Sequence, residues 1–209
     1  MTRGQGPSTT LAYRVFGAIG AERTIFVLRE GATATVDPDP PATAARDVRI
    51  VAVRLTPVEI SDPGAYGGET HAEVTVGSLA DLIETEQPGG AAIGLVGVAG
   101  AWDSAVLLAC ELGDRVDRLA LVAAPKPENA LARDEAERAL AGVSAKTLVM
   151  SGQRDASAAA ADAAWLKAHL ADARVEMVPP AAIRTVDGAL SLGDVWPRVL
   201  AHLAPGTTR

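Results

Sequence analysis

The stretch that decides the fold reads A-I-G-L-V-G-V-A-G-A from Ala92 to Ala101. Residues 93–98 form an uncharged apolar run with the length of one buried strand. Only glycine and alanine occupy positions 99–101, and an apolar, alanine- and leucine-containing segment follows at 102–112. A buried strand, a turn made of small residues and a helix predict one strand–turn–helix unit of a parallel sheet.

The same alternation of short strands and longer helical segments extends along the chain. Apolar or β-branched runs predict strands at 11–16, 24–28, 48–55, 93–98, 119–123, 147–151 and 174–178. Helical patterns cover 70–86, 102–112, 128–140, 158–170 and 192–203. The pattern predicts a three-layer α/β fold with a mainly parallel central sheet.

Several local features set the expected boundaries of these elements. Residues 1–10 are polar and predict a frayed terminus, which leaves residues 11–205 as one domain. The capping-box spacing of Thr70 and Glu73 predicts the start of the first long helix, and Pro197 is expected to shorten or kink the last one. Residues 33–46, with Asp37 and Asp39 among prolines, predict a solvated loop with at most one helical turn.

Composition excludes several classes of function. The net charge of -7, without clustered Lys and Arg, argues against nucleic-acid binding. Charged residues interrupt every apolar run before the roughly 18 residues that a membrane span needs. The single cysteine, Cys110, is expected to be a buried, inert thiol, and the protein is expected to be cytoplasmic. Neither zinc-ligand spacing nor a phosphate-binding loop is present, so no metal and no cofactor are predicted.

The decisive stretch resembles the centre of the α/β-hydrolase superfamily. In that family the turn reads G-x-S-x-G and lifts a nucleophilic serine above the sheet. Here Gly97 to Ala101 reads G-V-A-G-A, and the helix at 102–112 is followed by D-R-V-D-R-L at 114–119. The resemblance places Ala99 at the nucleophile position, where its methyl group has no atom that could attack a carbonyl.

The resemblance extends to the other two members of the family's catalytic triad. Residues 147–155 are similar to the strand and turn that present the catalytic acid, which implies that Asp155 is the acid. Residues 174–183 are similar to the strand and loop that deliver the catalytic histidine, but Ile183, followed by Arg184, stands there. Without a histidine to orient, Asp155 is expected to be a structural carboxylate.

The three histidines of the chain, His71, His169 and His202, all fall in expected helices or their first turns. A histidine at such a position is more often a surface residue than a displaced catalytic base. The sequence therefore predicts that no imidazole stands beside Ala99.

The family's oxyanion loop often carries a His-Gly pair, and this chain has Glu30-Gly31 in its place. A carboxylate at Glu30 would oppose the negative charge that the oxyanion hole stabilises. Many relatives insert a lid at the position of residues 125–146, which hold only a short helix here, so the resemblance implies an open crevice with no large cap domain. The mouth of this crevice is expected to be lined by Glu30, Ala99, Trp102, Lys126, Asp155 and Arg184, and the expected ligand-binding residues also include Gly31 and Gly100. Trp102 is expected to plug the vacated pocket rather than to cover a ligand.

Three functional hypotheses follow. The first is a non-hydrolytic pseudoenzyme or biosynthetic accessory protein that binds a small apolar or acyl-type ligand, with a protein partner or a homodimer left open. The second is a cyclase, lyase or decarboxylase in which Glu30 or Asp155 transfers a proton. The third is an esterase or thioesterase inactivated by a serine-to-alanine change at Ala99.

Overall fold

A computed structural model describes residues 11–30, 37–55, 75–152, 156–185 and 187–207. Its centre is one seven-stranded sheet with the strand order β1-β3-β2-β4-β5-β6-β7. The strands are β1 (Ala12–Gly17), β2 (Arg23–Arg29), β3 (Val48–Arg54), β4 (Ile93–Val98), β5 (Val116–Val122), β6 (Lys146–Ser151) and β7 (Ala173–Met177). Only β1 runs antiparallel, at the edge beside β3, and every other neighbouring pair is parallel.

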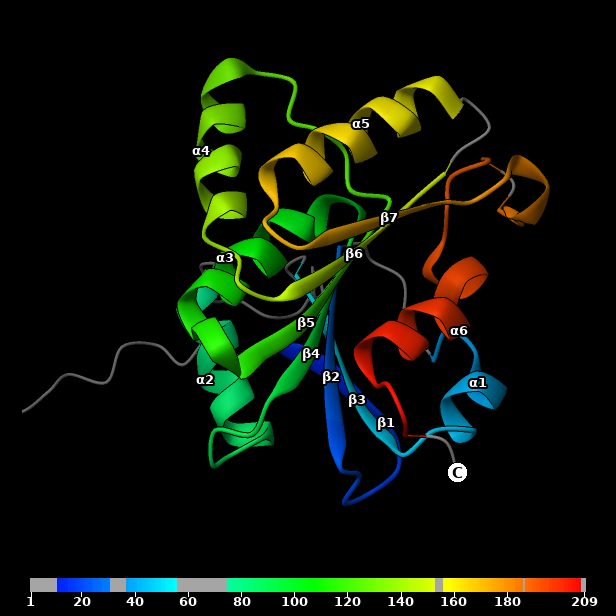
Figure 1. The fold of residues 1–209 in the computed structure, drawn as a ribbon. Coiled ribbons are helices and arrows are strands. Elements are labelled where there is room, and N and C mark those ends of the chain that lie inside the picture. Colours follow the sequence, from blue (N-terminus) through cyan, green and yellow to red (C-terminus); the bar gives the residue numbers. More distant parts are fainter. Residues whose placement is uncertain (1–10, 31–36, 56–74, 153–155, 186, 208–209) are drawn as a thin grey trace, which may run out of the picture.

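Helices cover both faces of this sheet (Figure 1). They are α1 (Pro40–Ala44), α2 (Val76–Glu86), α3 (Trp102–Leu112), α4 (Ala130–Ala141), α5 (Ala156–His169) and α6 (Leu192–Leu203). One apolar core lies between the sheet and α2, α3 and α5, and a second lies between the sheet and α6. The three-layer architecture without a large cap domain is confirmed.

The seven expected strands are all present, and their ends differ from the expected ones by at most three residues. The largest difference is at β5, which begins at Val116 instead of residue 119 because residues 116–118 continue the ladder with β4 and β6. The expected capping box at Thr70 and Glu73 lies outside the described residues. The described helix α2 begins at Val76, where Oγ1 of Thr75 accepts a hydrogen bond of 3.2 Å from the backbone N–H of Ser78.

Helix α6 runs through Pro197 without a break, contrary to the expected shortening. A proline inside a helix leaves the carbonyl four residues earlier without its helical donor, and here that carbonyl belongs to Gly193. The guanidinium of Arg184 donates to this oxygen over 2.8 Å. Arg184 thus replaces the backbone donor that is missing at Pro197. Arg184 belongs to residues 178–191, which join β7 to α6 and which we call the β7–α6 connection.

Two further structural expectations have clear outcomes. Cys110 is half-buried, its thiol donates to the carbonyl of Ala139 over 3.1 Å, and burial raises its pKa, which keeps the unreactive thiol form dominant. Within the described ranges, no helix has the length and apolar content to span a bilayer.

Candidate functional site

The turn after β4 has the strained geometry of a nucleophile elbow. Ala99 has φ of 49°, a left-handed conformation that is costly for any residue with a Cβ. Behind it, a Cβ added to Gly97 would lie 2.7 Å from Cβ of Ala105 and 2.8 Å from Cα of Trp102. Close approach of α3 to β4 at Gly97 thus holds the turn, and it leaves the methyl group of Ala99 exposed at the surface.

Glu30 stands beside this elbow because β2 and β4 are parallel neighbours. Arg29, the last residue of β2, pairs with Val98, the last residue of β4, so the residues that follow each strand lie at the same sheet edge. A Cβ added to Gly100 would lie 2.2 Å from Oε2 of Glu30. The Glu30 carboxylate thus lies directly against Gly100, and within the described ranges no residue donates a hydrogen bond to it.

A cavity of about 410 Å³ opens at this point, and we call it the elbow cavity. Its walls come from the ends of β2 and β4, from Asp37 and Pro38, and from the β7–α6 connection with the start of α6. The polar side chains that line it belong to Arg29, Glu30, Asp37, Thr185, Asp187 and Ser191, around the methyl group of Ala99. A cavity of this size, at the carboxyl ends of parallel strands, is suited to a small molecule.

Ile183, the residue expected at the histidine position, points into the protein interior. Its exposed fraction is 7%, and it belongs to the apolar core between the sheet and α6. Two residues later in the same connection, Thr185 reaches the elbow cavity. Position 183 is therefore a core position. The β7–α6 connection lines the cavity with later residues, beginning at Thr185.

Arg184, expected at the mouth of the crevice, instead braces α6. Its Nε lies 2.9 Å from Oδ1 of Asp194, and its guanidinium also donates to Gly193. Arg184 is not among the residues that line the elbow cavity. Asp194 and the Gly193 carbonyl freed by Pro197 instead occupy donors of the Arg184 guanidinium.

Asp194 remains charged although its side chain is only 1% exposed. Burial by itself would raise the pKa of this carboxyl, but hydrogen bonds from Arg184 and from the hydroxyl and backbone N–H of Ser191 outweigh that effect and lower it. These bonds fix the first turn of α6, which forms one wall of the elbow cavity.

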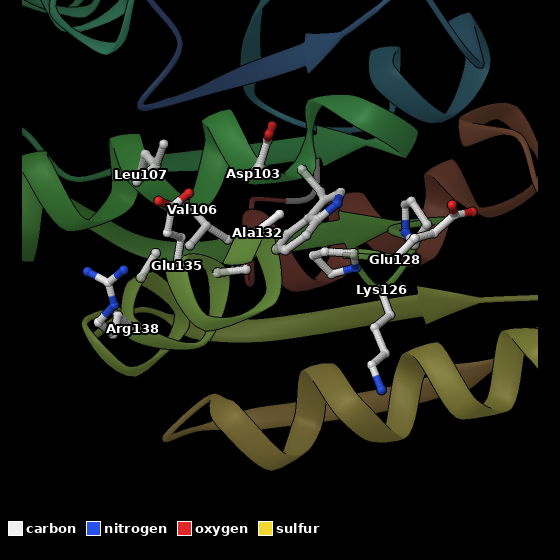
Figure 2. Close-up of a pocket in the computed structure, with 13 residues that line it drawn as sticks. Asp103, Val106, Leu107, Lys126, Glu128, Ala132, Glu135 and Arg138 are labelled. Atoms are coloured by element: carbon white, nitrogen blue, oxygen red, sulfur yellow. The ribbon is translucent and has the colours of Figure 1, made fainter. Parts of the chain in front are cut away.

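Trp102 and Lys126 line a different cavity from Ala99, shown in Figure 2. Trp102 is only 4% exposed and meets Trp165 of α5 edge to face, with ring centroids 6.2 Å apart. Lys126 extends toward α5, where its Nζ lies 6.0 Å from the centroid of the Trp165 ring. Trp102 does not line the elbow cavity, so its ring does not fill that cavity as expected.

The described histidines also lie away from the elbow. Nδ1 of His169 is 2.8 Å from the carbonyl of Trp165. Nε2 of His202 lies 3.1 Å from the carbonyl of Leu119 and 3.0 Å from that of Lys146, and burial lowers its pKa. His202 is half-buried on α6, away from Ala99. His71, Asp155 and Gly31 lie outside the described residues.

The sequence did not single out Asp37 and Thr185 as lining residues. Asp37 was interpreted as part of a solvated loop, but its Oδ1 accepts from the Thr43 hydroxyl over 2.8 Å and from the Asp39 N–H over 3.1 Å. The usable signal was local: Asp39 followed by two prolines is typical of a helix start, and Asp39 indeed caps α1. That short helix holds Asp37 at the cavity wall.

Comparison with solved structures gives the same fold. An enol-lactonase from Burkholderia xenovorans LB400 superposes with a TM-score of 0.62 at 16% identity, over 91% of this chain and 95% of that one. The α/β hydrolase MGS-MChE2, from a sediment metagenome of the Mar Chica lagoon in Morocco, gives 0.61 at 14% identity over 95% and 93%. A serine-to-alanine mutant of the meta-cleavage product hydrolase CumD from Pseudomonas fluorescens IP01, complexed with acetates, gives 0.62 at 12% over 91% and 92%.

Sequence comparisons add no closer relative, since neither a protein-family model nor a curated protein matches the chain. At identities of 12–16% this structural similarity shows the fold and does not identify the activity. Together with the sheet order and the elbow, it shows that this chain has the α/β-hydrolase fold.

Proposed function

We propose that this chain is a non-hydrolytic member of the α/β-hydrolase fold that binds a small molecule in the elbow cavity, as a pseudoenzyme or as an accessory protein of a biosynthetic step. The observation that carries the proposal is Ala99. It occupies the strained apex of the elbow, where it offers a methyl group to the cavity. An alkyl group cannot form an acyl-enzyme bond.

The negative charge of Glu30 also supports a non-hydrolytic function. In a hydrolase of this fold, the backbone N–H of the residue after the nucleophile donates to the developing oxyanion, and that residue is Gly100 here. The carboxylate of Glu30 lies against Gly100. A negative charge there repels an oxyanion, so restoring a serine alone should not restore an efficient acyl-transfer site.

The test compares the chain with Ala99→Ser on short acyl p-nitrophenyl esters and on an acyl-thioester. Melting curves establish that both proteins fold. We expect no turnover above the uncatalysed rate from either, because no described imidazole reaches the elbow to accept the serine proton. Turnover by the serine variant alone would identify a disabled hydrolase, and turnover by the parent would overturn the proposal.

A second candidate is an enzyme in which Glu30 transfers a proton during a cyclisation, lyase or decarboxylation step. The favouring observation is that its carboxylate is unpaired among the described residues and borders a cavity of small-molecule size. Asp155, the other carboxylate considered for this role, is outside the described residues. If a substrate is found, Glu30→Gln should abolish turnover with folding retained, and full turnover would remove this candidate.

A further inference from the structure

The second and larger cavity lies between α3 and α4 and has no part in the elbow. Its volume is about 810 Å³, and we call it the α3–α4 groove. One wall is the outward face of α3 with Val106 and Leu107, and the other is the face of α4 that carries Ala132 and Ala136. The segment from Pro125 to Glu128 and the ring of Trp102 complete the lining, and Figure 2 shows Lys126 and Glu128 at one end of the groove.

The groove exists because α4 presents small side chains to α3. Ala132, Ala136 and Ala139 recur at helical spacing on the side of α4 that faces α3, and a methyl group at each leaves space that larger residues would fill. On the opposite wall Leu107 is 47% exposed. Apolar surface is thus left open to solvent inside a concave site, and its removal from water is favourable.

The charges at the rim define the class of molecule that fits. The lining includes three acidic residues, Asp103, Glu128 and Glu135, and two basic residues, Lys126 and Arg138. The three carboxylates disfavour an anionic ligand, and the apolar interior, with an aromatic ring at one end, disfavours burial of any charged group. Lys126 is turned toward Trp165, away from the groove.

We propose that the α3–α4 groove is a binding site for a neutral, largely apolar small molecule with an aromatic or alkyl body. The site is separate from the elbow cavity and does not depend on the function proposed there. Its volume lies in the range of small-molecule pockets, roughly 300–1,000 Å³. Walls on three sides favour a compact ligand over the flat contact that a second protein needs.

The experiment uses the full chain and the neutral fluorophore N-phenyl-1-naphthylamine, whose emission rises in apolar surroundings. Ala136→Phe adds a ring to the α4 wall, and Ala189→Phe is the matched control because Ala189 lines the elbow cavity instead. We expect saturable binding by the parent, weakened about tenfold or more by Ala136→Phe and unchanged by Ala189→Phe. Melting curves accompany each variant.

A second readout keeps the test valid if Ala136→Phe fails to fold. In the parent chain, methyl NMR signals of Val106 and Leu107 should shift on titration, while those of Leu190 and Leu192 at the elbow cavity stay in place. Absence of saturable binding would overturn the proposal, as would loss of binding in Ala189→Phe alone. Sedimentation that shows dimers dissociated by the fluorophore would also overturn it, because the groove would then be an interface between copies.

Discussion

The elbow and the β7–α6 connection face the same cavity, but different forces hold them. The elbow is held by close backbone packing at Gly97, which forces Ala99 into a left-handed conformation. The connection is held by burial of Ile183 and by the hydrogen bonds of Arg184 to the start of α6. One side keeps a strained geometry without a reactive atom, whereas the other uses its residues to stabilise the core and α6.

This difference shows which part of the cavity wall depends on backbone packing and which part depends on side chains. The strand–turn–helix at the elbow is part of the sheet packing, so it persists whatever side chain stands at position 99. The β7–α6 connection is held by side chains instead, since Arg184 donates hydrogen bonds to Asp194 and to the Gly193 carbonyl that Pro197 leaves free. Four predictions test that contrast, from the largest expected effect to the smallest.

Gly97→Ala should cause the largest loss of stability, about 3 kcal/mol. The added Cβ meets backbone and Cβ atoms of α3, which can give way only if the helix moves. Gly100→Ala is the matched control, because its Cβ meets the carboxylate of Glu30, which can rotate away at little cost. Urea unfolding of both variants checks this, and equal losses would show that α3 packing does not hold the elbow.

Ile183→His should destabilise the protein by about 2 kcal/mol, because an imidazole would replace an apolar side chain in the core beneath α6. Thr185→His, two residues later, should change the free energy of unfolding by less than about 0.5 kcal/mol, since position 185 borders the elbow cavity. Thermal and urea unfolding measure both variants. A well-tolerated histidine at 183 would contradict the assignment of that position to the core.

Arg184→Gln should lower stability at neutral pH by about 1 kcal/mol, a modest value because the guanidinium is largely exposed. Arg184 helps to hold the pKa of Asp194 below its usual value. A lowered carboxyl pKa contributes stability above the unfolded-state pKa, near 3.9, and this contribution is lost as the pH falls through the folded-state value. Unfolding curves from pH 7 to pH 2 should show a shallower acid-induced loss in the variant than in the parent.

Ala99→Gly should have the smallest effect and should stabilise the protein by roughly 0.5 kcal/mol. Glycine adopts the positive φ without strain, and the entropy it loses on folding offsets part of that gain. Ala105→Gly in the middle of α3 is the control and should destabilise by about 1 kcal/mol. Thermal unfolding of both measures the effect, and a loss of stability in Ala99→Gly would mean that the elbow stores no strain at this residue.

The sequence predicted the sheet closely because buried parallel strands are short apolar runs, such as 93–98 and 147–151, that are readable without knowledge of their neighbours. It also placed Glu30 and Ala99 at one site, and the structure brings them together because β2 and β4 end at the same edge. Trp102 and Arg184, expected in the same crevice, do not line the elbow cavity. Trp102 follows the elbow directly in the chain, but its side chain lines the other cavity. Arg184 lies next to Thr185 of the elbow cavity, but its side chain bonds to the start of α6.

The sequence by itself determined the layer architecture, the small-residue turn and the identity of the residue at its apex, since these depend on local hydrophobicity and on the presence or absence of a side chain. Only the tertiary structure decided that Ile183 is buried, that Arg184 compensates for Pro197, and that the alanine face of α4 opens a second cavity beside Trp102. Those outcomes depend on which elements pack against one another and at what distance, and contacts between residues far apart in the chain leave no local pattern in the sequence.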